Sequence, residues 1–116
     1  MKLTDFNFPD KEIRFGSLLD IMRGKGFIFA EQWDYERAMF DLKMPVEGDP
    51  GVFYLRVPVF AVDGDIPGDE TTVKLMTPIL GRHYYPHGVE HGEEENFPDH
   101  IVDKCKQLLT SVDEEL

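Results

Sequence analysis

In the stretch "VFYLRVPVFAV", residues 52–62, apolar side chains recur at every second position, which is the pattern of a β-strand with one buried face. Its odd-numbered positions are all apolar, as in a strand with one face in a core: Phe53, Leu55, Val57, Val59 and Ala61. The even-numbered positions include Tyr54, Phe60 and Val62, whereas the second face of a sheet in a two-layer protein is usually polar. The stretch therefore predicts a strand whose second face binds a partner or a ligand, unless a short helix and the arm of residues 1–8 cover it.

Three further runs around this stretch have the composition of strands: residues 27–34, 38–44 and 72–80. Turn-forming clusters at 47–51 and 63–70 separate them, and the links are short. Successive strands are therefore expected to pair as an antiparallel meander. Because Pro58 and Pro78 cannot donate ladder hydrogen bonds, we expect a strongly bent sheet at those points.

Two helices are expected to flank the four strands. Residues 16–26 predict a short helix with Ser17 as its N-cap. Between Pro98 and Glu115, the apolar residues fall on one helical face: Ile101, Val102, Cys105, Leu108, Leu109 and Val112. The sequence thus predicts one α+β domain over residues 1–116: a short N-terminal helix, a four-stranded antiparallel sheet and a long C-terminal amphipathic helix that packs across it.

The charge and cysteine content limit the classes of function. The chain has 116 residues with 23 acids and 12 lysines and arginines, a net charge of −11. Nucleic-acid binding needs a basic stripe, and anionic lipid repels an acidic surface, so we expect neither nucleic acid nor membrane as a partner. Cys105 is the only cysteine, and the chain shows neither an apolar leader nor an apolar run of membrane-spanning length. These features favour a cytoplasmic protein without disulfides.

The stretch "HYYPHGVEHGEEE", residues 83–95, contains histidines at intervals of four: His83, His87 and His91. On a helix this spacing would place them on one side, but Pro86, Gly88 and Gly92 interrupt any helix. Nothing else in the pattern fixes a tetrahedral zinc geometry. The sequence therefore predicts no native metal site and no cofactor, and the three histidines remain weak candidates as metal ligands.

Seven residues are candidates for ligand binding: Trp33, Asp34, Tyr35, Arg56, Arg82, His83 and Tyr84. In "WDY" (33–35), the favoured interpretation is that Asp34 accepts hydrogen bonds from turn amides, and the alternative is a pocket lined by the two aromatic rings. Arg56 belongs to the third strand and "RHY" (82–84) follows the fourth. If these two strands are neighbours, their side chains form an anion-binding or acid–base cluster.

Two other features favour structural roles. The stretch "VDGD" (62–65) resembles a fragment of a calcium loop, but the remaining ligands of that motif are missing, so a turn is expected. Cys105 lies on the apolar face of the predicted C-terminal helix, which favours a buried and unreactive thiol.

The sequence contains no coherent set of catalytic residues, so the favoured hypothesis is a non-enzymatic module that binds a protein or a small ligand. A homodimer through the sheet face is its simplest form. The alternatives are a small enzyme with its site near Asp34, Arg82 and His83, and a metal-binding protein that uses the histidine stretch.

Four segments resemble the YugN-like family of small proteins from Bacillus and its relatives: "WDYERAMFDLK" (33–43), "YLRVPVFAVDGDI" (54–66), "VKLMTPILGRHYYPHG" (73–88) and "FPDHIVD" (97–103). The resemblance covers almost the whole chain, with each segment in the same order. It implies a compact bacterial α+β domain and supplies no catalytic residues.

Overall fold

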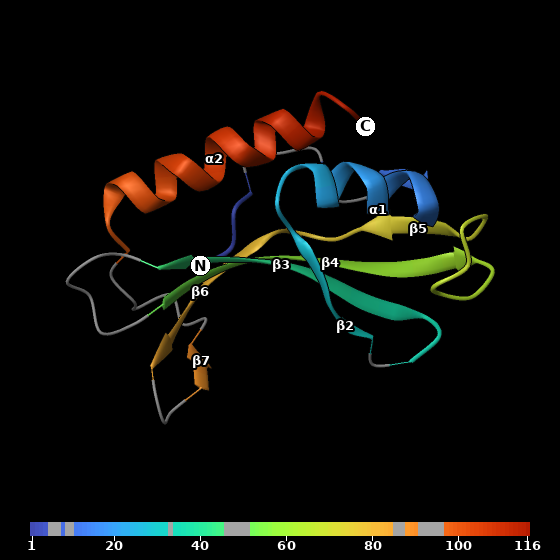
Figure 1. The fold of residues 1–116 in the computed structure, drawn as a ribbon, viewed down its shortest axis with the longest axis horizontal. Helices are drawn as coiled ribbons and strands as arrows, with labels where there is room; N and C mark the ends of the chain where they lie inside the picture. The colour runs from blue at the N-terminus through green and yellow to red at the C-terminus, as the bar shows by residue number, and fades with distance from the viewer. Residues whose placement is uncertain (5–7, 9–10, 33, 46–51, 85–87, 91–96) are drawn as a thin grey trace.

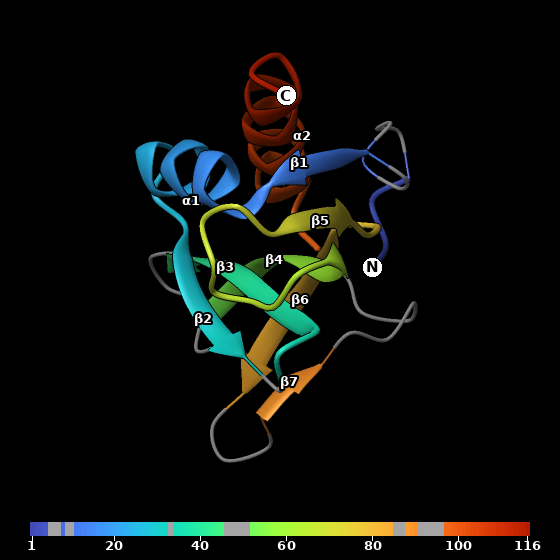
Figure 2. The same cartoon turned by 90° about the vertical axis from the view of Figure 1, so that its right-hand side faces the viewer.

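Two helices and one sheet form two layers in the described part of the chain (Figure 1). The structure, a computed structural model, describes the following residues: 1–4, 8, 11–32, 34–45, 52–84, 88–90 and 97–116. Every strand pair within these ranges is antiparallel, and both helices lie on the same face of the sheet (Figures 1 and 2). The predicted α+β class with an antiparallel sheet is therefore confirmed.

Strand β4 (Val52–Asp63) is the centre of the sheet and contains the predicted strand 52–62. Along one side it pairs with β3 (Arg37–Pro45), and along the other it pairs with β6 (Ile79–Tyr84) and then β5 (Thr72–Leu75). Three outer strands complete the sheet: β2 (Ile28–Gln32) beside β3, β1 (Glu12–Arg14) beside β5 and β7 (Gly88–Glu90) beside β6.

The expectation of four strands is wrong, because the described residues contain seven. The predicted run 72–80 is divided between β5 and β6: Leu75 pairs with Val59, whereas Ile79 pairs with Arg56. From Leu75 to Ile79 the run advances by four residues, whereas β4 advances by three between their partners. The run therefore contains one extra residue relative to β4, as in a β-bulge. The other additional strands, β1 and β7, have three residues each, which is too short for alternation to reveal.

The two prolines occupy positions where the sheet does not need their missing N–H groups. The carbonyl of Pro58 accepts a hydrogen bond from the amide of Met76 at 2.9 Å, on the side where the bulge interrupts the ladder. The carbonyl of Pro78 accepts from the amide of Leu3 at 2.9 Å, on the opposite side of its strand from β4. The carbonyl of each proline thus accepts a hydrogen bond, and its nitrogen lies where no regular strand neighbour requires a donor.

Helix α1 (Phe15–Gly24) begins two residues before the predicted Ser17 cap. Its N-cap is Arg14, which makes no side-chain capping bond, so the Ser17 prediction is wrong. The loop between β4 and β5 satisfies the first amides instead: the amide of Phe15 donates to the Thr71 carbonyl at 2.7 Å, and that of Gly16 donates to the Asp69 carbonyl at 3.0 Å. A distant loop therefore replaces the local cap.

The core lies between the sheet and the two helices. Helix α2 (Asp99–Asp113) turns its predicted apolar face inward, and these four residues are buried: Ile101, Cys105, Leu109 and Val112. Leu3 and Phe8 of the N-terminal arm also belong to this core. The alternative in which α1 and the arm cover the second face of β4 is therefore wrong, because both pack on the α2 side.

Candidate functional site

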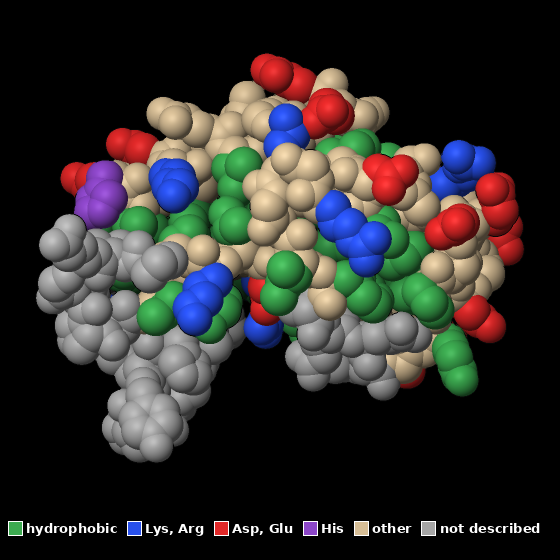
Figure 3. All heavy atoms as spheres, in the orientation of Figure 1, with side chains coloured by type: hydrophobic (Ala, Val, Ile, Leu, Met, Phe, Trp, Pro, Cys, Tyr) green, Lys and Arg blue, Asp and Glu red, His purple; other side chains and the backbone are tan. Residues whose placement is uncertain are grey.

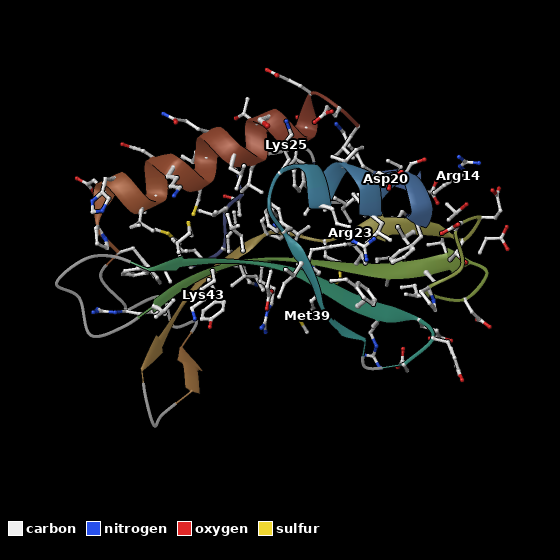
Figure 4. The ribbon with its side chains drawn as sticks, viewed as in Figure 1. Arg14, Asp20, Arg23, Lys25, Met39 and Lys43 are labelled. Carbon is white, nitrogen blue, oxygen red and sulfur yellow. The ribbon has the colours of Figure 1, made fainter. Side chains whose placement is uncertain are left out.

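The side of the sheet that faces away from α1 and α2, which we call the outer face, carries the even-numbered side chains of β4. Cross-strand pairs on this face join β3 and β4: Lys43 with Tyr54, Asp41 with Arg56, Met39 with Pro58 and Arg37 with Phe60. Figure 4 shows Met39 on this side and Asp20 of α1 on the other. The four β4 side chains are only partly buried, so the second face of β4 remains available at the surface.

A cavity of about 360 Å³ opens on the outer face, beside the bulge between β5 and β6. Its lining is mainly apolar: Arg37, Ala38, Met39, Arg56, Pro58, Val59, Met76 and Ile79. Met39 is 7% exposed but does not belong to the core, whereas Met76 at the rim is 43% exposed. The volume lies within the range of about 300–1,000 Å³ typical of small-molecule sites.

Arg56 enters this lining as one half of a buried ion pair. Its Nε and Nη2 donate to the two carboxylate oxygens of Asp41 at 2.8 and 2.9 Å, a bidentate arrangement. The Asp41 residue is 6% exposed, although its face of the sheet has no helix over it in the described structure. The pair fixes the Arg56 guanidinium at the cavity wall and keeps both charges compensated.

Arg37 enters the lining as the first residue of β3, directly after the turn from β2. The Asp34 carboxylate accepts hydrogen bonds from the amides of Glu36 and Arg37 at 2.8 and 2.9 Å, and its second oxygen lies 3.2 Å from the Arg37 guanidinium. The Glu36 amide, followed by the side chain of Arg37, lowers the pKa of Asp34. The structural interpretation of Asp34 as an acceptor for turn amides is therefore confirmed.

Of the other predicted binding residues, Tyr35 and Arg82 have described side chains, and neither lines the cavity; Tyr35 is 68% exposed. Arg82 pairs with Phe53 on the helix side of the sheet, and its guanidinium carbon lies 5.2 Å from the centre of that ring. Arg56 and Arg82 are therefore on opposite faces, and the structure does not bring Arg82 to Asp34. His83 pairs with Val52, an outer-face register position, but the side chains of His83 and Tyr84 lie outside the described residues, as does Trp33.

The histidine stretch contributes little to the described structure. His87 and His91 lie outside the described residues, and β7 begins at Gly88. Among the residues that are described, no group of three or more histidines, cysteines or carboxylates is placed to hold a metal ion. The "VDGD" segment forms the predicted turn, with Gly64 at a φ of 92°, a conformation that favours glycine.

Cys105 is fully buried in α2, and its sulfur lies 3.9 Å from that of Met44. Burial raises the pKa of the thiol to about 12, so the nucleophilic thiolate is disfavoured at neutral pH. The prediction of a buried cysteine is confirmed.

A second, polar recess lies beside the start of α1 and contains charges of both signs (Figure 4). Arg14 pairs there with Glu70 at 3.3 Å, and both side chains are largely exposed. Acidic side chains gather over α2 and at the end where β4 turns into β5 (Figure 3). These exposed groups do not surround an apolar cavity, so the outer face is the stronger candidate site.

Of the predicted binding residues that the structure describes, Arg56 alone lines the outer-face cavity. Sequence reasoning missed Arg37, Met39, Met76 and Ile79. The alternation of residues 37–43 contained a usable signal, because it places Arg37 and Met39 on the face opposite Phe40. The bulge that brings Met76 and Ile79 to the cavity has no comparable signal.

No helix in the described residues is both long enough and apolar enough to cross a membrane.

Comparison with known proteins gives consistent matches over most of the chain. The YugN-like family model matches residues 5–114. The uncharacterized protein YlbA of Bacillus subtilis (strain 168) is 42% identical over 112 residues, which cover 97% of this chain and 92% of that protein. The uncharacterized protein YugN of the same organism is 29% identical over 77 residues, covering 66% of this chain and 56% of that protein.

A solved structure has the same fold. The crystal structure of the uncharacterized conserved protein YugN from Geobacillus kaustophilus HTA426 superposes with a TM-score of 0.87 at 39% identity, covering 100% of this chain and 94% of that one. The match supports the arrangement of helices and sheet.

Proposed function

The chain belongs to the YugN-like family, and from that premise we propose that residues 1–116 form one domain that works as a non-enzymatic binding module. Its site is the cavity on the outer face. The observation that carries the proposal is a cavity of about 360 Å³ with mainly apolar walls, on the face of the sheet opposite both helices.

The chemistry of the walls supports binding over catalysis. The charged side chains in the lining are Arg37 and Arg56, and each is paired with a carboxylate, Asp34 or Asp41. Guanidinium groups keep their protons at all ordinary pH values, so they are poor agents of proton transfer. Apolar walls with a few fixed polar groups are typical of a site that holds a ligand in one orientation.

The five methionines allow a direct test. Met39 and Met76 line the cavity, whereas Met22 and Met44 lie in the core on the other face. We expect titration with octanol to shift the NMR signals of the isotope-labelled methyl groups of Met39 and Met76 and to leave those of Met22 and Met44 in place. Equal shifts at all four, or none at the cavity pair, would remove the proposed site.

A pair of tryptophan variants separates cavity filling from a general change of the surface. Ile79→Trp places an indole at the cavity wall, and we expect it to abolish the octanol-induced shifts. Val62→Trp is the matched control, since Val62 is 42% exposed and lies outside the lining. It should bind octanol as the parent chain does.

A homodimer through the outer face is the second proposal. It is favoured by the apolar surface that continues past the cavity at Phe60 and Val62, the latter 42% exposed. The outer face also carries the cations Arg37 and Lys43, and bringing two copies of this face together adds like charges to one interface, which opposes association. Light scattering tests the dimer: a monomer at micromolar concentration rules it out, and a dimer lost in Val62→Glu supports it.

We also propose a cytoplasmic location. Cys105 is the single cysteine and is buried, which suits a compartment where thiols stay reduced. Fractionation of native cells is the test, and recovery of the protein in the secreted fraction would contradict the proposal.

A further inference from the structure

The polar side chains in the cavity wall are hydrogen-bond donors. Arg37 and Arg56 carry N–H groups and no acceptor, and the remaining lining side chains are apolar. A ligand whose polar group can only donate would therefore meet no side-chain acceptor in this lining. We propose that the site takes a small amphiphile with an apolar body and a single carboxylate head, an inference that rests on the proposed binding function.

The two arginines are suited to different roles in binding the carboxylate head. Arg56 is fixed by the bidentate contact with the buried carboxylate of Asp41, so its position at the wall is set before any ligand arrives. Arg37 is 59% exposed and its ion pair with Asp34 is at the surface. Since exposed pairs contribute little to stability, a ligand carboxylate can share or replace this contact at small cost.

The charges around the cavity favour an anionic head. Outer-face positions at and opposite residues 54–60 of β4 carry four cations and one carboxylate (Arg37, Lys43, Arg56, Lys74 and Asp41). Two further carboxylates adjoin them, Asp34, which pairs with Arg37, and Glu12, which lies opposite Lys74. The whole chain has the reverse balance, with 23 acids against 12 lysines and arginines. Four cations thus lie among three carboxylates at this surface, so an anion meets less repulsion here than the net charge of the whole chain would suggest.

Three ligands with the same alkyl chain and different heads test the proposal: octanoate, octanol and octylamine. Binding is followed by the labelled methyl signals of Met39 and Met76, with Met22 and Met44 as internal references. Because a charge-assisted hydrogen bond is stronger than a neutral one, we expect octanoate to bind about tenfold tighter than octanol. Octylamine should bind more weakly than octanol.

Two glutamine variants test whether Arg37 receives the head. Arg37→Gln should reduce octanoate affinity about tenfold and leave octanol affinity unchanged, because the amide keeps a donor and loses the charge. Arg14→Gln is the matched control: the Arg14 side chain is 60% exposed against 59% for Arg37, and each is paired with one carboxylate. Arg14 lies outside the cavity lining, so its substitution should change neither affinity.

The possible results separate the inference from the function on which it rests. Equal affinity for octanoate and octanol, with shifts at Met39 and Met76, would overturn the carboxylate inference and leave the binding function standing. Equal losses of octanoate and octanol affinity in Arg37→Gln would also overturn it. If none of the three ligands shifts the cavity methionines, both proposals fail.

Discussion

The two faces of β4 have similar side-chain volumes and very different surroundings. On the inner face, Phe53, Leu55 and Val57 are completely buried beneath the two helices. On the outer face, Tyr54, Arg56 and Pro58 are partly exposed, and the described helices lie on the opposite side. A sheet face covered by a second layer gains most of its stability from excluding water, whereas an uncovered face is stabilised mainly by contacts along the sheet.

In this sheet the inner face provides the core that stabilises the fold, and the outer face provides the candidate binding site. Among the described residues no helix covers the outer face, and cross-strand contacts stabilise it, above all the pair of the buried Asp41 with the partly exposed Arg56. The bulge beside Met76 and Pro58 leaves a hollow there instead of a regular ladder. Substitutions on the inner face should therefore change stability, and those around the hollow should change binding.

The largest effect is expected from Phe40→Ala. Phe40 is fully buried on the inner face, where its ring centre lies 6.1 Å from that of Phe15. Truncation of a buried phenylalanine removes apolar contacts and leaves a cavity, which costs about 3–5 kcal/mol. In urea unfolding, the variant should have a lower midpoint concentration, and the dependence of the unfolding free energy on urea concentration should be unchanged.

Phe60→Ala is the matched substitution on the outer face. Phe60 pairs with Arg37 and keeps part of its surface exposed, so we expect a smaller cost of about 1–2 kcal/mol. Equal costs for the two phenylalanines would show that the outer face is as well covered as the inner one, and the comparison between the faces would be lost.

Asp41→Asn should have the next largest effect. The substitution removes the negative charge that compensates Arg56, whose side chain is 21% exposed. A partly buried guanidinium without its carboxylate should cost about 2–3 kcal/mol, somewhat less than a fully buried one. The free energy of unfolding from urea titration is the measurement.

The double variant Asp41→Leu with Arg56→Met controls for the loss of the pair itself. Apolar replacement of both members is often close to neutral, because the desolvation cost of both charges disappears with them. We therefore expect stability near that of the parent chain. If the double variant were as unstable as Asp41→Asn, the ion pair itself would stabilise the folded state. The cost of Asp41→Asn could then not be explained only by leaving Arg56 without its carboxylate.

The contrast between the faces was only partly predictable from the sequence. Alternation in residues 52–62 identified β4 and its inner face, because every second residue is apolar there. The helical spacing from Ile101 to Val112 identified the buried side of α2 for the same reason. Periodicity is a local property, so a single segment is enough to reveal it.

The features that create the cavity depend on contacts between distant segments. The Ser17 cap failed because the carbonyls of Asp69 and Thr71, far along the chain, satisfy the first amides of α1. The division of the run 72–80 into β5 and β6 depends on its register with β4. A cluster of Arg56 with Arg82 was one arrangement that neighbouring strands could produce, and the register excludes it because it places the two arginines on opposite faces.

Cys105→Ala tests the layer that covers the inner face. The sulfur is fully buried against Met44, so its removal should cost about 1–2 kcal/mol at neutral pH. The thiol of the unfolded chain ionises above about pH 8.5, whereas burial raises the pKa in the folded state to about 12. Between these values the unfolded state binds fewer protons, so rising pH lowers the stability of the parent chain.

The stability difference between the parent chain and Cys105→Ala should therefore narrow as the pH rises from about 7 to about 10. Urea unfolding of both proteins at each pH provides the measurement, and titration of lysines and tyrosines cancels in the difference. A constant difference across this range would mean that the thiol ionises alike in both states and is open to solvent.

The smallest change in stability is expected for Met76→Ala, which is also the sharpest test of the separation between folding and binding. Met76 is 43% exposed at the cavity rim, so its truncation should alter the free energy of unfolding by less than about 0.5 kcal/mol. Met44→Ala is the matched control, since Met44 is 2% exposed in the core and its loss should cost about 2–4 kcal/mol.

Ligand affinity should respond to the two substitutions in the reverse order, with the larger loss in Met76→Ala. Loss of the Met76 side chain removes apolar contact with the alkyl chain of a ligand, so octanol and octanoate affinities should fall together by about three- to tenfold. Met44→Ala should leave both affinities unchanged wherever the protein remains folded, because Met44 lies on the other face. If Met44→Ala weakened binding as much as Met76→Ala, the two faces would be energetically coupled through the sheet, and the hollow would depend on core packing and not on the bulge alone.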